Sequence, residues 1–237
     1  MRLRHFPSFA CVLAALALAG CVAQNRSLLD KLPQSGSAEG TKILVMPLDV
    51  ELYELGAGGF LEPKAEWSAA ARNYLTAAFR AAYAARSIRT MELDEAKVSA
   101  ASADDIHQLI KLHGAVGNAM LKHEYAPPGK LPAKEGRFDW SLGPSAGILR
   151  TNYGADYALF TYVRDSYSSG GRVAVQIVGA LLGVGIQGGI QTGFASLVDL
   201  RTGNVVWFNR ILRGTGDLRN AASATETTGV LLAGFPQ

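Results

Sequence analysis

The C-terminal third of the chain contains Gly193-Phe194-Ala195-Ser196-Leu197-Val198-Asp199-Leu200, then Arg201-Thr202-Gly203-Asn204, then Val205-Val206-Trp207-Phe208-Asn209-Arg210-Ile211-Leu212. The two outer runs are rich in β-branched and aromatic residues, which favour strands. A short linker that contains glycine and joins two such runs is typical of a β-hairpin. We therefore expect two antiparallel strands over 193–200 and 205–212.

Upstream of this hairpin, strand-like and helix-like patterns alternate. Apolar runs over 41–48, 87–93 and 154–163 are short enough to be strands, and the first is apolar enough to be buried on both faces. Apolar residues recur every three or four positions over 64–85 and 103–124, which predicts helices with one buried face. Asp217 can cap a final helix that extends to about residue 233. The order of elements predicts an α/β fold, a mixed sheet flanked by helices with a C-terminal β-hairpin and a final helix.

The stretch from Val173 to Val198 is long and carries no charged side chain, but it holds six glycines. Each glycine costs a helix about 1 kcal/mol relative to alanine, so one continuous spanning helix is not expected. One interpretation is a helix over 172–182, a loop over 183–189 and a strand from Ile190. The others are an extended soluble hairpin and a membrane-inserting hairpin, because apolar and small residues nearly alternate.

The N-terminus has the layout of a secretory signal. Arg2 and Arg4 supply positive charge, residues 11–18 are continuously apolar, and Leu18-Ala19-Gly20-Cys21 places a cysteine after two small residues. This stretch resembles the bacterial lipoprotein signal, which implies cleavage after residue 20 and lipidation of Cys21. The alternatives are an ordinary signal peptide with a chance cysteine and a buried helix.

Several acyl chains on Cys21, palmitate among them, would hold the protein stably on a membrane, whereas one chain alone gives marginal binding. In lipoproteins of two-membrane bacteria, an Asp after the cysteine resembles an inner-membrane retention signal. Val22 stands there instead, so we expect a lipid anchor in the outer membrane with the body facing the periplasm. The predicted division is a signal peptide over 1–20, a flexible tether over 21–40 and a single α/β domain over 41–237.

Charge and cysteine content exclude several classes of function. The formal charge of the chain is +3, but loss of residues 1–20 removes Arg2 and Arg4 and no acid, which leaves 21 basic and 20 acidic side chains. No basic patch for nucleic acid is therefore expected. Cys11 would leave with the signal and Cys21 would be acylated, so the body would have no thiol for a disulfide, a nucleophile or a metal site.

Two motifs are typical of enzymes, but their context does not support catalysis. The GxGxxG pattern at 183–188 binds dinucleotides only between a first strand and a helix, and here strand-like sequence follows it. The GxSxG pattern around Ser145 is followed in hydrolases by the acid and then by the histidine. All four histidines precede Ser145, so this order fails. A triad in another chain order stays open.

The remaining titratable residues give no metal or acid-base pattern. His107, His113 and His123 are six and ten residues apart, not the four that places two ligands on one helix face. We expect His113 to be a hydrogen-bonded histidine at the edge of the core. Asp139, Asp156, Asp165 and Asp199 have no spacing that brings two of them together. No catalytic residue, cofactor or metal site is predicted.

From Ile43-Leu44-Val45-Met46-Pro47, through Gly154-Ala155-Asp156-Tyr157-Ala158-Leu159-Phe160, to the hairpin and Trp207, the chain resembles a superfamily of periplasmic lipoproteins. Its members include the curli secretion channel lipoprotein and lipoprotein activators of penicillin-binding proteins. The resemblance implies an α/β sandwich that assembles, scaffolds or exports cell-envelope components and performs no chemistry. No site residue is transferred, because residues that match the channel's constriction loop are not found.

The sequence therefore predicts a non-catalytic accessory lipoprotein of the cell envelope that binds a protein partner. The alternative is a subunit of an oligomeric outer-membrane secretion pore in which residues 170–198 insert in the membrane. A homo-oligomer is left open, and the partner is not identified. If surface aromatics form a docking site, the first candidates are Tyr162, Tyr167 and Trp207, which are otherwise expected in the core.

Overall fold

A computed structural model describes residues 25–33, 40–94, 96, 98–126, 129–214 and 216–236. The strands are β1 (Arg26–Ser27), β2 (Ile43–Val45), β3 (Asp49–Leu55), β4 (Leu61–Pro63), β5 (Thr90–Glu92), β6 (Tyr157–Ser168), β7 (Gln191–Asp199) and β8 (Val205–Arg213). The helices are α2 (Ala65–Ala85), α3 (Ala100–Met120), α4 (Gly147–Tyr153), α5 (Gly170–Leu181) and α6 (Ala221–Leu231). A π-helical segment, η2 (Leu121–Tyr125), continues α3, and 3₁₀ turns form at η3 (Pro132–Lys134) and η4 (Pro144–Ala146).

The described strands form one mixed sheet in the order β1-β8-β7-β6-β2-β5. The long strand β6 pairs in parallel with β2 through its first residues and with β3 through the rest, and β4 extends β3 as a hairpin. The predicted C-terminal hairpin is confirmed as β7 and β8, which pair antiparallel. Gly203 closes the turn at φ 75°, and an added Cβ there would lie 2.0 Å from the carbonyl oxygen of Gly143.

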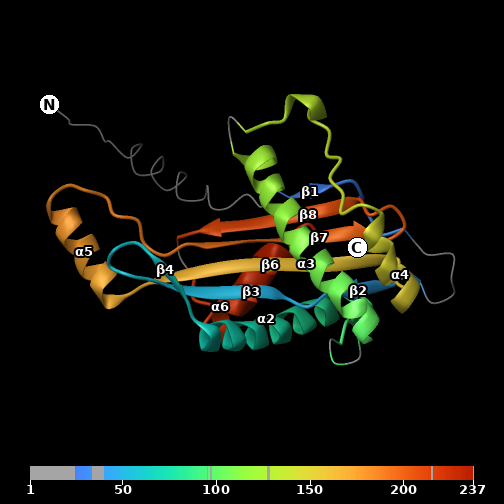
Figure 1. The fold of residues 1–237 in the computed structure, drawn as a ribbon, viewed down its shortest axis with the longest axis horizontal. Helices are drawn as coiled ribbons and strands as arrows, with labels where there is room; N and C mark the ends of the chain where they lie inside the picture. The colour runs from blue at the N-terminus through green and yellow to red at the C-terminus, as the bar shows by residue number, and fades with distance from the viewer. Residues whose placement is uncertain are drawn as a thin grey trace, which may run out of the picture.

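Helices cover both faces of this sheet (Figure 1). Side chains of a strand alternate between the faces, so Leu159 of β6 packs with α2 and α6, while Phe160 packs with α3 and α4. A β-bulge between Leu197 and Val198 shifts the register of β8. The predicted helices over 64–85 and 103–124 and the final helix are confirmed, with α2, α3 and α6 covering the two faces.

The first predicted strand differs from the structure. The sequence predicts one strand over 41–48, but β2 ends at Val45 and a new strand, β3, begins at Asp49. Pro47 lies in the connection, because it has no backbone N–H to donate to a neighbouring strand. The sequence does not predict β3 and β4 at all. Together they build a hairpin that extends beyond β2 beside the second half of β6.

The uncharged stretch adopts the helix, loop and strand interpretation. Residues 170–181 are α5, an irregular segment follows, and β7 begins at Gln191. Both hairpin interpretations of this stretch are wrong. The alternative of a pore with residues 170–198 inserting is also wrong as stated, because β7 lies between β6 and β8 and is buried on both faces.

The predicted tether differs from the structure in residues 25–33. Arg26 and Ser27 pair with Phe208 and Trp207 of β8, and the backbone N–H of Leu28 donates to the carbonyl of Val206 at 2.8 Å. Leu29 and Leu32 pack against the core on the α2 and α6 face. The folded body therefore includes these residues, because two leucines and an edge of β8 are available to hold them.

Candidate functional site

Cys21 lies outside the described residues, and so does the signal sequence that precedes it. The chain is held to the body from Asn25, whose side-chain amide donates to the carbonyl of Ala233 at 3.2 Å. Only residues 22–24 separate this contact from Cys21. Four residues span at most about 14 Å, so a lipid on Cys21 would keep the body close to its membrane.

The two enzyme-like motifs lie in contexts that differ from those of the enzymes that use them. Ser145 is exposed in η4, and its hydroxyl donates to the carbonyl of Leu142 at 3.3 Å. His113 and His123 bind elsewhere, to Ser196 and to the carbonyl of Gly129. The glycines of 183–188 lie between a helix and a strand, the reverse of the strand-to-helix order that a dinucleotide site needs.

His113 lies within the core, deeper than the position at the core edge that the sequence predicts. Its side chain is 2% exposed, stacks on Phe160 with ring centroids 4.8 Å apart, and places Nε2 2.9 Å from the hydroxyl of Ser196. Burial lowers the pKa of His113 to about 3. The imidazole is therefore neutral at ordinary pH and has no access to a substrate.

The four aspartates singled out in the sequence have separate partners. Asp139 pairs with Lys134, Asp156 with Arg150 and Asp199 with Arg201. Asp156 and Asp199 do line the same shallow pocket, but each faces its own arginine. Across the described ranges, no three His, Cys, Asp or Glu side chains are arranged to hold a metal ion.

The fourth aspartate, Asp165, is buried at the end of the sheet. Its Oδ2 accepts from Gln191 at 2.9 Å and from the hydroxyl of Tyr167, and Tyr167 in turn accepts from the backbone N–H of Leu218 at 2.7 Å. The side-chain carbonyl oxygen of Gln191 accepts from Arg213 and Thr227, at 2.8 and 3.1 Å. Desolvation raises the pKa of Asp165 even though these donors oppose it. The network joins α6 to the sheet, and its acceptors are engaged by the protein itself.

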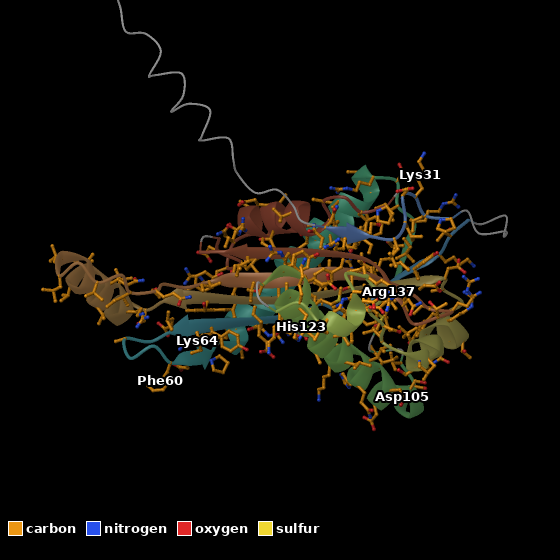
Figure 2. The ribbon with its side chains drawn as sticks, turned by 90° about the horizontal axis from the view of Figure 1, so that it is seen from above. Lys31, Phe60, Lys64, Asp105, His123 and Arg137 are labelled. Carbon is orange, nitrogen blue, oxygen red and sulfur yellow. The ribbon has the colours of Figure 1, made fainter. Side chains whose placement is uncertain are left out.

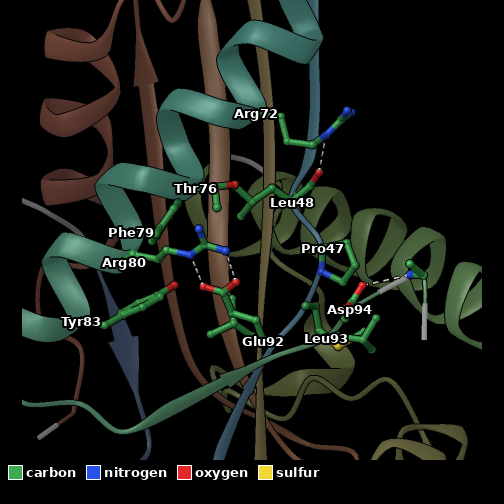
Figure 3. A pocket seen from close by; sticks show the side chains of 13 residues that line it. Pro47, Leu48, Arg72, Thr76, Phe79, Arg80, Tyr83, Glu92, Leu93 and Asp94 are labelled. Atoms are coloured by element: carbon green, nitrogen blue, oxygen red, sulfur yellow. Dashed lines mark hydrogen bonds and ion pairs between the residues drawn. The ribbon is translucent and has the colours of Figure 1, made fainter. Parts of the chain in front are cut away.

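A groove of about 650 Å³ runs between α2 and the edge formed by β2 and β5 (Figure 3). Arg80 and Glu92 form a bidentate ion pair across it, with Nε and Oε1 2.6 Å apart, and the pairing lowers the pKa of Glu92. Arg72 donates to the carbonyls of Leu48 and Val50, at 3.3 Å each. Burial raises the pKa of Tyr83, which also lines the groove. Glu92 is therefore held as a paired carboxylate and Tyr83 as a protonated phenol at neutral pH, a state in which neither acts readily as a general base.

The most unusual surface is the end of the molecule where α5 projects beyond the sheet (Figure 1). We call it the apolar tip and define it as residues 56–61, the turn between β3 and β4, together with residues 170–186. Phe60, labelled in Figure 2, is 84% exposed, and Leu181 and Leu182 are 82% and 75% exposed. Exposed apolar side chains gathered in this way mark contact sites for proteins or membranes.

The three aromatic residues that the sequence offers as candidates for a docking site, Tyr162, Tyr167 and Trp207, lie outside the apolar tip. Trp207 is fully buried and packs on Phe235, with ring centroids 5.1 Å apart. Tyr162 stacks on Phe194, and the guanidinium of Arg164 lies over the Tyr162 ring, 3.9 Å from its centroid. Tyr167 belongs to the Asp165 network. Most of the tip lies in the uncharged stretch, but only its exposure identifies it.

Comparison with known proteins gives distant likenesses only. No family model matches the sequence, and no curated protein matches it. Among solved structures, a PelC dodecamer from Paraburkholderia phytofirmans aligns at 14% identity and a TM-score of 0.37, over 90% of this chain and 98% of that chain. Lipoprotein GNA1162 from Neisseria meningitidis aligns at 12% identity and a TM-score of 0.29, over 73% of this chain and 79% of that chain. The LpoB C-terminal domain from Salmonella enterica aligns at 15% identity and a TM-score of 0.26, over 85% of this chain and 91% of that chain. Likenesses at these values assign neither a family nor a function to the chain.

Proposed function

We propose that this chain is a lipoprotein, anchored through Cys21 in the outer membrane and facing the periplasm, that acts as a non-catalytic assembly, scaffold or export accessory factor of the cell envelope. The observation that carries the proposal is the sequence Leu18-Ala19-Gly20-Cys21 after a charged and apolar N-terminal run. Several acyl chains on one cysteine give stable membrane residence.

The folded body supports a binding role more than a chemical one. His113 is sealed in the core, Asp165 and Gln191 are engaged by other side chains, and the hydroxyl of Ser145 donates to the carbonyl of Leu142. Within the described part of the chain, no helix has both the length and the apolar character to cross a bilayer. Under this proposal, attachment depends on the lipid at Cys21, and function depends on surfaces.

Metabolic labelling with palmitate tests the anchor. We expect label in the wild-type protein, and none in the Cys21→Ser variant. Cys11→Ser is the matched control, because Cys11 is the other cysteine of the chain and would be removed with the signal. Equal labelling of the Cys21→Ser variant, or an intact N-terminus on the purified wild-type protein, would contradict the proposal.

Crosslinking in the native membrane tests the accessory role. Membranes separated by density are expected to contain the wild-type protein in the outer-membrane fraction. Crosslinking there should join it to envelope proteins that are not captured when Cys21→Ser releases it. A wild-type protein found with the inner membrane would remove the predicted location and leave the lipid anchor intact.

A further inference from the structure

The apolar tip is an ordered part of the fold. Ser169 caps α5 by accepting from the backbone N–H of Arg172 at 3.1 Å. Arg172 donates to the carbonyl of Gln187 at 2.8 Å, and Gln176 donates to that of Ile186 at 3.3 Å. These contacts fold the loop back on the inward face of α5. The outward face, with Ile177, Val178 and Leu181, is left exposed.

The inward face is packed closely enough to fix the orientation of the helix. A Cβ added to Gly179 would lie 2.7 Å from Cδ1 of Ile186, so loop and helix are in direct contact at that position. Arg172 also donates to the carbonyl of Ala57 at 3.4 Å, which joins α5 to the turn between β3 and β4. The turn that carries Phe60 is therefore joined to the first turn of α5, the helix that ends at Leu181.

The chemistry of this surface fits a lipid bilayer better than a protein. Residues 170–190 contain a single charged side chain, Arg172, and no acid, and residues 56–61 contain no charge. Protein interfaces surround their apolar centre with a polar rim. A helix that lies in a membrane interface instead presents one apolar face to the acyl chains, with polar groups behind it. In the tip, Arg172 and Gln176 are turned back onto the loop, and the projecting side chains are apolar.

The described chain from Asn25 enters the sheet from the direction of the tip. Arg213, the last residue of β8, pairs with Gln191 directly after the tip loop, so β8 runs toward the tip. β1 is antiparallel to β8, and the chain therefore enters the sheet from the direction of the tip. Asn25 follows Cys21 by four residues, a span of at most about 14 Å.

We infer that the apolar tip is a second, non-covalent membrane contact, in which the outward face of α5 and Phe60 enter the boundary between headgroups and acyl chains. This deepens the proposed function and rests on it only for the position of the lipid on Cys21. Apolar insertion drives the contact, since Arg172 is the only cation in the tip. Two contacts fix the orientation of the body on the membrane, whereas one acyl anchor leaves it free to rotate.

The mature chain without its acyl groups separates this contact from the anchor. After Cys21→Ser the mature chain has no cysteine, so Leu181→Cys introduces a unique site for an environment-sensitive fluorophore. With vesicles of phosphatidylethanolamine and phosphatidylglycerol, we expect a blue shift and a rise in emission. The same fluorophore at Leu112→Cys, on the exposed side of α3, is the control and should not respond. Identical emission at position 181 with and without vesicles would overturn the inference.

Flotation with the same vesicles measures the contribution of single side chains. In the Cys21→Ser mature chain, Leu181→Asp and Ile177→Asp should each lower binding by about tenfold or more, because an aspartate is expelled from the acyl region. Leu112→Asp should bind like the parent chain, and a circular dichroism spectrum confirms the fold of each variant. Replacing the phosphatidylglycerol by phosphatidylcholine should change binding by less than about threefold, since one cation contributes little attraction.

Two results would overturn the inference without affecting the lipid anchor. One is a parent chain that stays unbound at all lipid concentrations. The other is an oligomer in solution that Leu181→Asp dissociates, without any vesicle binding, because the occupant of the tip is then a second copy of the chain. Palmitate labelling of Cys21 is independent of both results, so loss of the anchor and loss of the tip contact are told apart.

Discussion

Most of α5 and β7 comes from one continuous uncharged stretch, Val173 to Val198, yet β7 is buried and α5 is largely exposed. β7 is buried on both faces, and Phe194 in its middle is 0% exposed. α5 projects from the end of the sheet, and its outward side chains are exposed. The two halves are both apolar, so composition does not decide which is buried. Neighbours decide it: β7 has β6 and β8 beside it, whereas α5 contacts its own loop, the tip of one hairpin and β6.

The difference teaches that burial in this protein follows strand pairing. The backbone of β7 needs hydrogen-bond partners on both edges, and the helices that cover the two faces then seal its side chains. A helix satisfies its backbone internally, so α5 can stand outside the body without a cost in unpaired groups. The two regions should therefore respond differently to substitution, and the following changes are expected to separate them.

The largest effect is expected in β7 from Phe194→Ala. Phe194 stacks on Tyr162 at 4.7 Å and on Phe208 at 5.5 Å, and its removal leaves a cavity. We expect the free energy of unfolding to fall by about 3–5 kcal/mol. Urea unfolding measures this change. Ile177→Ala in α5 is the control, and its free energy of unfolding should stay within about 0.5 kcal/mol of the wild-type value. Equal effects at the two positions would remove the distinction between the regions.

The second effect is a pH dependence that belongs to the body alone. Burial lowers the pKa of His113 to about 3, from 6.5. Between these values the unfolded chain binds a proton that the folded chain does not, so stability is lost as the pH falls below about 6.5. The expected loss at pH 5 is about 2 kcal/mol. His113→Gln should abolish this part of the dependence.

Asp165 changes stability with pH in the direction opposite to His113, so the measurement of the His113 effect must allow for it. Its pKa is raised, so the folded chain holds the proton more tightly and stability falls as the pH rises through the folded pKa. Comparing unfolding of the wild-type and His113→Gln proteins at pH 5 and 7 cancels the contribution of Asp165. A difference that does not change between these pH values would show that His113 is not sealed as described.

The third effect compares two glycines of α3 that face the sheet. A Cβ at Gly117 would lie 2.0 Å from Phe194, whereas a Cβ at Gly114 would lie 3.4 Å from Tyr162. Gly117→Ala should destabilise the protein by about 1–3 kcal/mol, because Phe194 has no free space to move into. Gly114→Ala should be neutral or stabilising by up to about 1 kcal/mol, because alanine favours the helix. The midpoints of urea unfolding measure both changes, provided that the dependence of the free energy of unfolding on urea concentration is unchanged.

The smallest effect is expected in the tip, where Leu181→Ser should change the free energy of unfolding by less than about 0.5 kcal/mol. Leu181 is 82% exposed, so its side chain gains little from folding. The same variant should need less detergent to stay in solution. A loss of more than about 1 kcal/mol would show that this face of α5 is covered in the folded protein, contrary to its exposure.

Local patterns predict most of the elements and miss the ones that depend on distant contacts. The period of three and four over 64–85 and the β-rich runs around Gly203 give α2, β7 and β8 close to their observed bounds. β3 is missed because Asp49–Leu55 carries three acids, Asp49, Glu51 and Glu54, which weaken a strand pattern. In the fold, Arg164 of the neighbouring β6 binds Asp49 at 2.7 Å and Glu51 at 3.3 Å, a contact between segments far apart in the chain.

The candidate site is predictable in one part and not in the other. Lipidation of Cys21 is a prediction that rests on its immediate neighbours, Leu18 to Gly20, and needs no fold. The tip joins residues 56–61 to residues 170–186 through a contact between Ala57 and Arg172. Nothing in either segment alone indicates that the turn carrying Phe60 contacts the first turn of α5.

The sequence by itself determined the order of most helices and strands and the expected lipidation signal, because both are encoded within a few neighbouring residues. Only the tertiary structure decided which half of the uncharged stretch is buried, where β2 gives way to β3, and that residues 25–33 pack on the body, with Arg26 and Ser27 in the sheet. Each of these outcomes depends on a partner far away in the chain, and hydrophobicity alone does not say which partner will be there.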